Sequence, residues 1–207
     1  PTTTPSQPPS VATTPTKQAV AETVVSSRTA ESGTVLNFPW EQRTAAAVFE
    51  RGRDIWIVFS RPTDVKIPLL RTVLPASVID IQQFAYTGNT ALRLTTDGSL
   101  HAGVSQAKDS FGWNVNLSPA TTAATQDVSL KANNLTHEQE LILGAYDVAE
   151  PLRFYDPRVG DWLVVIPSYE LGRGVMNDRN FPEFSLLKTP QGIAIAGTTT
   201  ELATETS

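Results

Sequence analysis

The sequence predicts an all-β fold of antiparallel hairpins arranged like a β-sandwich, with one short helix and a disordered or extended N-terminal arm. Three observations lead to this fold class. Short apolar runs alternate with turn-forming Gly, Pro, Asn and Asp residues. The longest apolar run, WLVVI at 162–166, has the length of a strand. The first 32 residues are rich in Pro and Thr and offer few large side chains to bury.

Composition divides the chain into five segments. They are a Pro/Thr-rich arm or linker at 1–32, a β-sandwich-like module at 33–117, a connecting segment at 118–150, a second small β-hairpin unit at 151–197, and a polar tail at 198–207. Without the arm, about 175 residues are left, which is enough to bury a core without metals or disulfides. The polar character shared by the two ends favours a segment flanked by linkers within a longer polypeptide.

The first module is expected to consist mainly of strands. Apolar patterning places them at 34–38, 45–49, 55–59, 78–84, 90–95, 100–106 and 112–117. A turn at 50–54 joins two of them, and the Asp97-Gly98 pair predicts a hairpin between 90–95 and 100–106. The pattern at 64–74 fits a short helix with Pro68 in its first turn, where the missing N–H has no cost.

The second unit is expected to contain two hairpins. One joins 152–155 to 162–166 through DPRVGD, and the other joins 184–188 to 193–196 through TPQG. Between the units, Thr136 and Gln139 could form a helix capping box, but the LIL that follows at 141–143 suits a strand equally well. Helix and strand therefore both stay open for this stretch.

Two of the expected strands, 55–59 and 162–166, are apolar on both faces. A strand that is wet on one side shows alternation, as 112–117 does with its asparagines. The second face of 55–59 and of 162–166 must therefore be covered by the helix, by the other unit or by another chain.

Charge and cysteine content restrict the class of partner. The formal net charge of −5 and the pI near 5.0 argue against sequence-independent nucleic-acid binding. Arg51 and Arg53 stand among the acids Glu50 and Asp54, which indicates a solvated hairpin rim instead of a phosphate patch. The absence of cysteine favours export, and no apolar run is long enough to span a membrane as a helix.

The sequence predicts no catalytic, cofactor or metal site. His101 and His137 stand alone, without the spacing of a zinc motif. Asp156 and Asp161 could act as a carboxylate pair in a hydrolase, but their position around Pro157 and Gly160 favours a role as turn formers.

The tryptophans are candidates for a binding surface. Trp56 and Trp162 lie in doubly apolar strands and are expected in the core, whereas Trp40, between a proline and a glutamate, is expected to be partly exposed. The candidate residues for binding a partner or a glycan are Trp40, Trp113, Asn114, Asn116, Arg51 and Arg53.

The stretch TVLNFPWEQRTAAAVFERGRDIWIVFSRP at 34–62 resembles the AMIN-type β domain of bacterial envelope proteins. The stretches LRFYDPRVGDWLVVIP and FSLLKTPQGIAIA resemble parts of large, poorly characterised periplasmic proteins with proline-rich linkers. This resemblance implies a periplasmic, non-catalytic β-sandwich that helps to localise a larger protein at peptidoglycan or within an envelope assembly. It provides no catalytic residues to carry over. The chain departs from the AMIN pattern in the helical segment 64–74 and in the second β unit.

Three hypotheses follow for function. The first is a scaffold component of a periplasmic, multiprotein envelope assembly, binding other envelope proteins through strand edges and the N-terminal arm. The second is a peptidoglycan- or glycan-binding module that uses exposed tryptophans, Trp40 foremost. The third is a hydrolase with Asp156, Asp161 or His101 at its centre.

Overall fold

The computed structural model describes residues 22–23, 25–30, 33–86, 88–108, 111–134, 139–144, 147–182 and 184–197. It confirms the predicted fold class, because these residues form mostly antiparallel strands and one short helix. The predictions for most of the arm, for the polar tail and for His137 lie outside the described residues.

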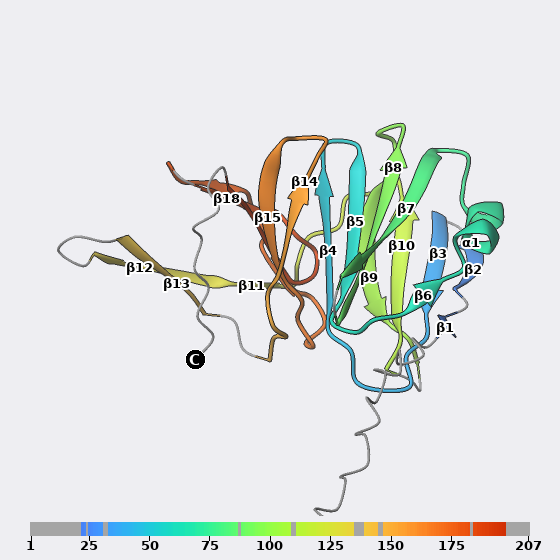
Figure 1. Ribbon diagram of the computed structural model, residues 1–207, viewed down its shortest axis with the longest axis horizontal. Helices are drawn as coiled ribbons and strands as arrows, with labels where there is room; N and C mark the ends of the chain where they lie inside the picture. Colours follow the sequence, from blue (N-terminus) through green and yellow to red (C-terminus); the bar gives the residue numbers. More distant parts are fainter. Residues whose placement is uncertain are drawn as a thin grey trace, which may run out of the picture.

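Three sheets form the body of the molecule (Figure 1). The first sheet has the strand order β2 (Ser26–Ala30), β3 (Gly33–Phe38), β10 (Trp113–Ser118), β9 (His101–Gln106). The middle sheet has the order β4 (Ala46–Arg51), β5 (Asp54–Phe59), β8 (Asn89–Thr96), β7 (Val78–Tyr86). The third sheet has the order β14 (Leu152–Asp156), β15 (Asp161–Ile166), β19 (Ile193–Gly197), β18 (Phe184–Leu187), β17 (Arg179–Asn180).

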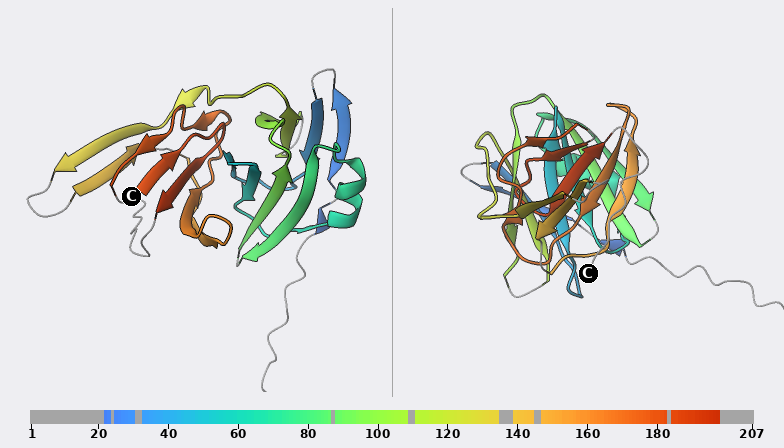
Figure 2. Two further views of the ribbon diagram at one scale, coloured as in Figure 1. Left: turned by 90° about the horizontal axis from the view of Figure 1, so that it is seen from above. Right: turned by 90° about the vertical axis from the view of Figure 1, so that its left-hand side faces the viewer.

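Shorter elements connect and flank the sheets. They are the parallel pair β1 (Glu22–Thr23) and β6 (Asp64–Val65), the helix α1 (Ile67–Val73), the parallel pair β11 (Gln126–Asp127) and β16 (Arg173–Gly174), and the hairpin of β12 (Ser129–Asn134) and β13 (Gln139–Gly144). The stretch left open between helix and strand is therefore a strand. Its hairpin projects from the third-sheet end of the molecule in both Figure 1 and the left view of Figure 2. Two strands, β1 and β2, lie within the segment that the sequence assigned to the arm.

The middle sheet is covered on both faces. On one face, Ile55 and Ile57 pack with Val115 of the first sheet, which is sandwich packing. On the other face, Trp56 and Val58 pack with residues of β14 and β15. Residues 55–59 are apolar on both faces because the first sheet covers one face of β5 and the third sheet covers the other.

The third sheet is buried on both faces in the same way. Leu163 and Val165 face the middle sheet, whereas Val164 and Ile166 belong to a separate apolar cluster that includes Val128. Segments that lead into β12 and out of β16 supply part of this cluster, together with the third sheet's own strands. The pattern of 162–166 therefore also has its cover within the chain.

The predicted hairpin at Asp97-Gly98 was wrong. β8 pairs with β7, and Tyr86 stands opposite Asn89 in this pairing. β9 pairs instead with β10 in the first sheet. The Asp-Gly turn thus carries the chain from one sheet to the other, because local turn chemistry fixes a reversal and not the sheet that the next strand joins.

Backbone hydrogen bonds join the middle and third layers along β4. The amide of Ala46 donates to the carbonyl of Ser168 at 3.0 Å, and Ser168 returns a bond to Ala46 at 2.9 Å. The amide of Val48 donates to the carbonyl of Gln191 at 2.9 Å. The outer edge of β4 is therefore paired within the chain at Ala46 and Val48, so this part of the edge is not open to a partner strand.

Tyr86 lies between the middle and third sheets, and burial raises the pKa of its hydroxyl. Its ring stacks on Phe154 at a centroid distance of 5.3 Å. Because the folded pKa is above the unfolded one, the protein gains stability from neutral Tyr86 below about pH 10 and loses it as the pH rises further. We expect the tyrosinate absorbance to show a late-titrating component that Tyr86→Phe removes. If the Tyr86→Phe variant keeps the late-titrating component, and its absorbance is lower only in proportion to the one missing tyrosine, this assignment is contradicted.

Candidate functional site: a cleft between the sandwich and the third sheet

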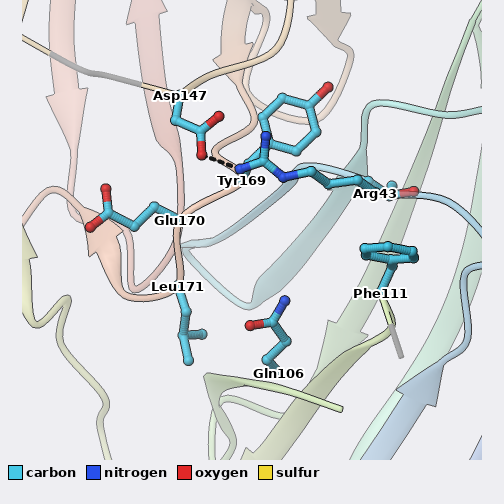
Figure 3. Close-up of a pocket in the computed structure, with 8 residues that line it drawn as sticks. Arg43, Gln106, Phe111, Asp147, Tyr169, Glu170 and Leu171 are labelled. Atoms are coloured by element: carbon cyan, nitrogen blue, oxygen red, sulfur yellow. Dashed lines mark hydrogen bonds and ion pairs between the residues drawn. The ribbon is translucent and has the colours of Figure 1, made fainter. Parts of the chain in front are cut away.

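A cleft of about 350 Å³ opens between the sandwich and the loops of the third sheet (Figure 3). Four separate segments contribute to it: the loop before β4, the end of β9 with the turn that follows, the segment before β14, and the loop after β15. Its lining residues are Arg43, Thr44, Gln106, Phe111, Asp147, Tyr169, Glu170 and Leu171.

Arg43 is the central polar residue of the cleft. One of its terminal nitrogens is ion-paired with Asp147, and its guanidinium carbon lies 4.5 Å from the centre of the Tyr169 ring. The Arg43 side chain is nonetheless 59% exposed. Its remaining N–H groups therefore stay available to a ligand in the cleft.

Asp147 holds Arg43 from an unusual backbone conformation. Its φ is 58°, a left-handed value that Asp tolerates better than most residues. Its carbonyl accepts a hydrogen bond from the amide of Tyr169 at 2.9 Å. The two residues that contact the Arg43 guanidinium are thus fixed to each other through the backbone.

The other walls of the cleft are apolar or amide groups. Figure 3 shows Phe111 and Leu171 on opposite sides of the space below Arg43, with the Gln106 amide at its floor. Phe111 is 48% exposed and Leu171 is 39% exposed. Glu170 turns its carboxylate away from the centre and pairs with Arg173 at 2.7 Å. The cleft thus offers hydrogen-bond donors between two apolar walls, with its acids already paired.

The residues predicted as a binding surface do not come together. Trp113 is buried in the sandwich, and its indole N–H donates to the carbonyl of Thr44 at 2.8 Å. Asn114 lies on the outer face of the first sheet, where it accepts a hydrogen bond from Asn37 at 2.8 Å, and Asn116 follows it on the same strand. Trp113 approaches the cleft through its bond to the backbone of Thr44, and the side-chain amide of Asn114 donates to the carbonyl of the cleft residue Gln106 at 3.5 Å.

Arg51 and Arg53 lie in the β4–β5 turn and differ in role. Arg53 is exposed, as expected of a solvated rim. Arg51 is nearly buried, with 13% of its side chain exposed, and it contacts Asp161 at 2.6 Å and Asp156 at 3.1 Å. The interpretation of Arg51 as a solvated residue was therefore wrong, because the β14–β15 turn packs against it.

The residues predicted for a hydrolase site, Asp156, Asp161 and His101, do not form one site either. Asp156 and Asp161 share Arg51, while His101 bonds through Nδ1 to Glu50 at 2.9 Å, between β9 and β4. Neither arrangement lines the cleft. Among the residues that the structure describes, no group of three or more His, Asp or Glu residues is placed to hold a metal ion. Within the same residues, no helix is both long and apolar enough to cross a membrane.

The exposure expected of two tryptophans is reversed. Trp40 is buried, with 9% of its surface exposed, because it packs against Phe59 at a centroid distance of 5.2 Å. Trp162 is only half-buried and contacts the exposed Tyr155 edge-on at 5.6 Å. The Trp162 side chain lies on the same face of β15 as Val164 and Ile166, but it is outside the apolar cluster that buries those two residues.

Fluorescence quenching tests this reversal. Of the four tryptophans, Trp56 and Trp113 are fully buried and Trp40 nearly so. We expect Trp162→Phe to remove most of the emission that acrylamide can quench, and Trp40→Phe to remove almost none. Equal losses in the two variants contradict the burial described above.

The cleft could hardly have been predicted from the sequence. Its residues come from four segments, and none of them belongs to a recognisable motif. The one usable signal was Phe111, an aromatic residue in the short link between the strands predicted at 100–106 and 112–117. Comparison with protein families, with curated proteins and with solved structures found no match to this chain.

Proposed function

We propose that this chain is a non-catalytic structural component of a bacterial cell-envelope assembly, and that it binds partner proteins through several separate surfaces. The envelope location rests on the AMIN-like stretch at 34–62 and on the absence of cysteine. The binding role rests on the distribution of exposed apolar side chains.

In the part of the chain that the structure describes, the large exposed apolar side chains lie on three sets of elements. The α1–β7 patch consists of Leu69, Val73 and Ile79, the cleft contributes Phe111 and Leu171, and the β14–β15 patch consists of Tyr155 and Val159. Grouped apolar exposure is typical of interaction sites, whereas single exposed apolar residues are ordinary. Three groups on different elements favour a scaffold with more than one contact.

The charged groups favour a structural role as well. Arg51, Asp156 and Asp161 are engaged with one another between two turns, which leaves neither carboxylate placed as a free acid or base. The edge of β4 is paired within the chain at Ala46 and Val48, so we place the binding surfaces at the apolar patches and at the N-terminal arm.

Site-specific crosslinking in the native envelope tests the proposal. The chain has no cysteine, so Leu69→Cys, Phe111→Cys and Val159→Cys each introduce a single attachment point for a photocrosslinker. We expect each patch variant to give discrete, stoichiometric adducts that mass spectrometry identifies as envelope proteins. Thr121→Cys, at an exposed polar position, is the matched control. A clean monomer from native membranes, without adducts above this control, contradicts the proposal.

A glycan-binding role is the second candidate, and one observation favours it. Trp162 and Tyr155 form an exposed aromatic pair on the third sheet, and the guanidinium carbon of Arg153 lies 5.4 Å from the Trp162 ring centre. Exposed aromatic rings can stack on sugar faces. Retention on isolated peptidoglycan that is lost in Trp162→Ala and kept in Phe111→Ala supports this candidate over the first.

A further inference from the structure

The cleft is rich in hydrogen-bond donors that lack partners. Among the described residues, the Gln106 side-chain amide has no hydrogen-bond partner, and Arg43 pairs only through one terminal nitrogen. The acids at the rim, Asp147 and Glu170, are already paired with arginines. A ligand that matches this cleft supplies carbonyl acceptors, carries apolar groups to place between Phe111 and Leu171, and has no strong net charge.

A proline-rich segment has this chemistry. Proline has no backbone N–H, so such a segment carries more acceptors than donors. In the polyproline II conformation there are no internal hydrogen bonds, which leaves the carbonyls free, and aromatic-lined grooves are the usual receptors for such segments.

The chain itself contains a matching segment at residues 1–21. It includes Pro1, Pro5, Pro8, Pro9 and Pro15, has no acidic residue, and carries a single lysine. The absence of acids in it avoids repulsion from the carboxylates at the rim of the cleft.

Length and attachment allow this segment to reach the cleft. It joins the fold at β1, which pairs with β6 at the lower end of the molecule in Figure 1, where the loop between β3 and β4 that carries Arg43 also lies. At about 3.1 Å per residue, 21 residues in polyproline II span about 65 Å. By comparison, a compact chain of 207 residues has a radius of gyration of only about 17 Å.

We infer that the cleft formed by Arg43, Gln106, Phe111 and Leu171 is a receptor for proline-rich segments, and that residues 1–21 of the same chain occupy it. The tether supplies a high local concentration, so a shallow site suffices for occupancy. A partner that binds the cleft must then displace this segment. The inference deepens the proposed function by naming the ligand class of one of the three surfaces.

Paramagnetic broadening in the purified full-length chain tests the inference. Ser6→Cys gives the chain its only cysteine, to which a nitroxide is attached. We expect loss of most of the amide signal intensity at Gln106, Phe111 and Leu171, with recovery on reduction of the nitroxide. The double substitution Pro8→Ala and Pro9→Ala is expected to restore much of this intensity, because it weakens the polyproline II preference.

Matched variants separate binding from simple proximity. Phe111→Ala is expected to abolish the broadening at Gln106 and Leu171, whereas Tyr155→Ala, which removes an aromatic ring of equal exposure elsewhere, is expected to leave it unchanged. Broadening that is absent, or that persists in Phe111→Ala, overturns the inference. If a spin-labelled copy broadens the signals of an unlabelled copy, and no broadening occurs within the labelled chain itself, the assignment of residues 1–21 of the same chain as the occupant is overturned. Because this test uses the isolated protein, its failure is distinct from a failure of crosslinking in the envelope.

Discussion

Arg51→Ala is expected to lower the free energy of unfolding by about 3 kcal/mol, because it leaves a buried carboxylate without its cation. Asp156 is 1% exposed, and Arg51 reaches one of its oxygens at 3.1 Å while also holding Asp161. The remaining cation near Asp156, Arg93, is 4.0 Å away. Equilibrium unfolding in urea measures the loss.

Arg53→Ala is the matched control for this substitution. It removes the same side chain from the same turn, at an exposed position, and is expected to change the stability by no more than about 0.5 kcal/mol. The double variant Arg51→Ala and Asp161→Ala is expected to lose less stability than the sum of the two single losses, because both substitutions remove the same ion pair. Equal stabilities for Arg51→Ala and Arg53→Ala contradict the burial of this ion pair.

Gly192→Ala is expected to have an effect of similar size at the other contact between the layers. Gly192 has a φ of 71°, and a Cβ built there lies 2.6 Å from the Cβ of Ala47 and 2.9 Å from its Cα. The left-handed backbone conformation costs an alanine about 1–2 kcal/mol, and overpacking adds about 1–3 kcal/mol, so a total loss of about 2–5 kcal/mol is expected.

Gly52→Ala isolates the conformational part of that loss. Gly52 has a φ of 61°, but an added Cβ meets nothing within 4 Å. We expect this control to lose only about 1–2 kcal/mol. If the two alanine variants unfold at the same urea concentration, with the same slope, then Gly192 does not approach β4 as closely as described.

Strand positions could be predicted from the sequence because they depend on local information. The apolar runs of β5 and β15 and the turns beside them are each encoded within a few residues. Sheet membership was harder, as the Asp97-Gly98 turn shows, because it is decided by which apolar faces pack together across the whole chain.

Side-chain exposure and the cleft required tertiary information. Trp40 lies between a proline and a glutamate, yet Phe59 and the sandwich cover it, while Trp162 in an apolar strand reaches beyond its cover. Asp156 was predicted as a turn former, and its carboxylate does accept a bond from the amide of Arg158 at 3.0 Å. Its ion pair with Arg51 spans 105 positions in sequence and leaves no local signal.

The burial of the middle sheet between two others has a consequence for how the chain folds as it is synthesised. β5 is complete at Phe59, and its partners in the sandwich are complete at Ser118, but the strands that cover Trp56 and Val58 begin only at Leu152. A ribosome at about 5–20 residues per second makes this interval a matter of seconds. During that time an apolar sheet face is open to water, so the nascent chain is a substrate for holding chaperones, and a fragment that stops near residue 118 is expected to aggregate instead of behaving as an independent domain.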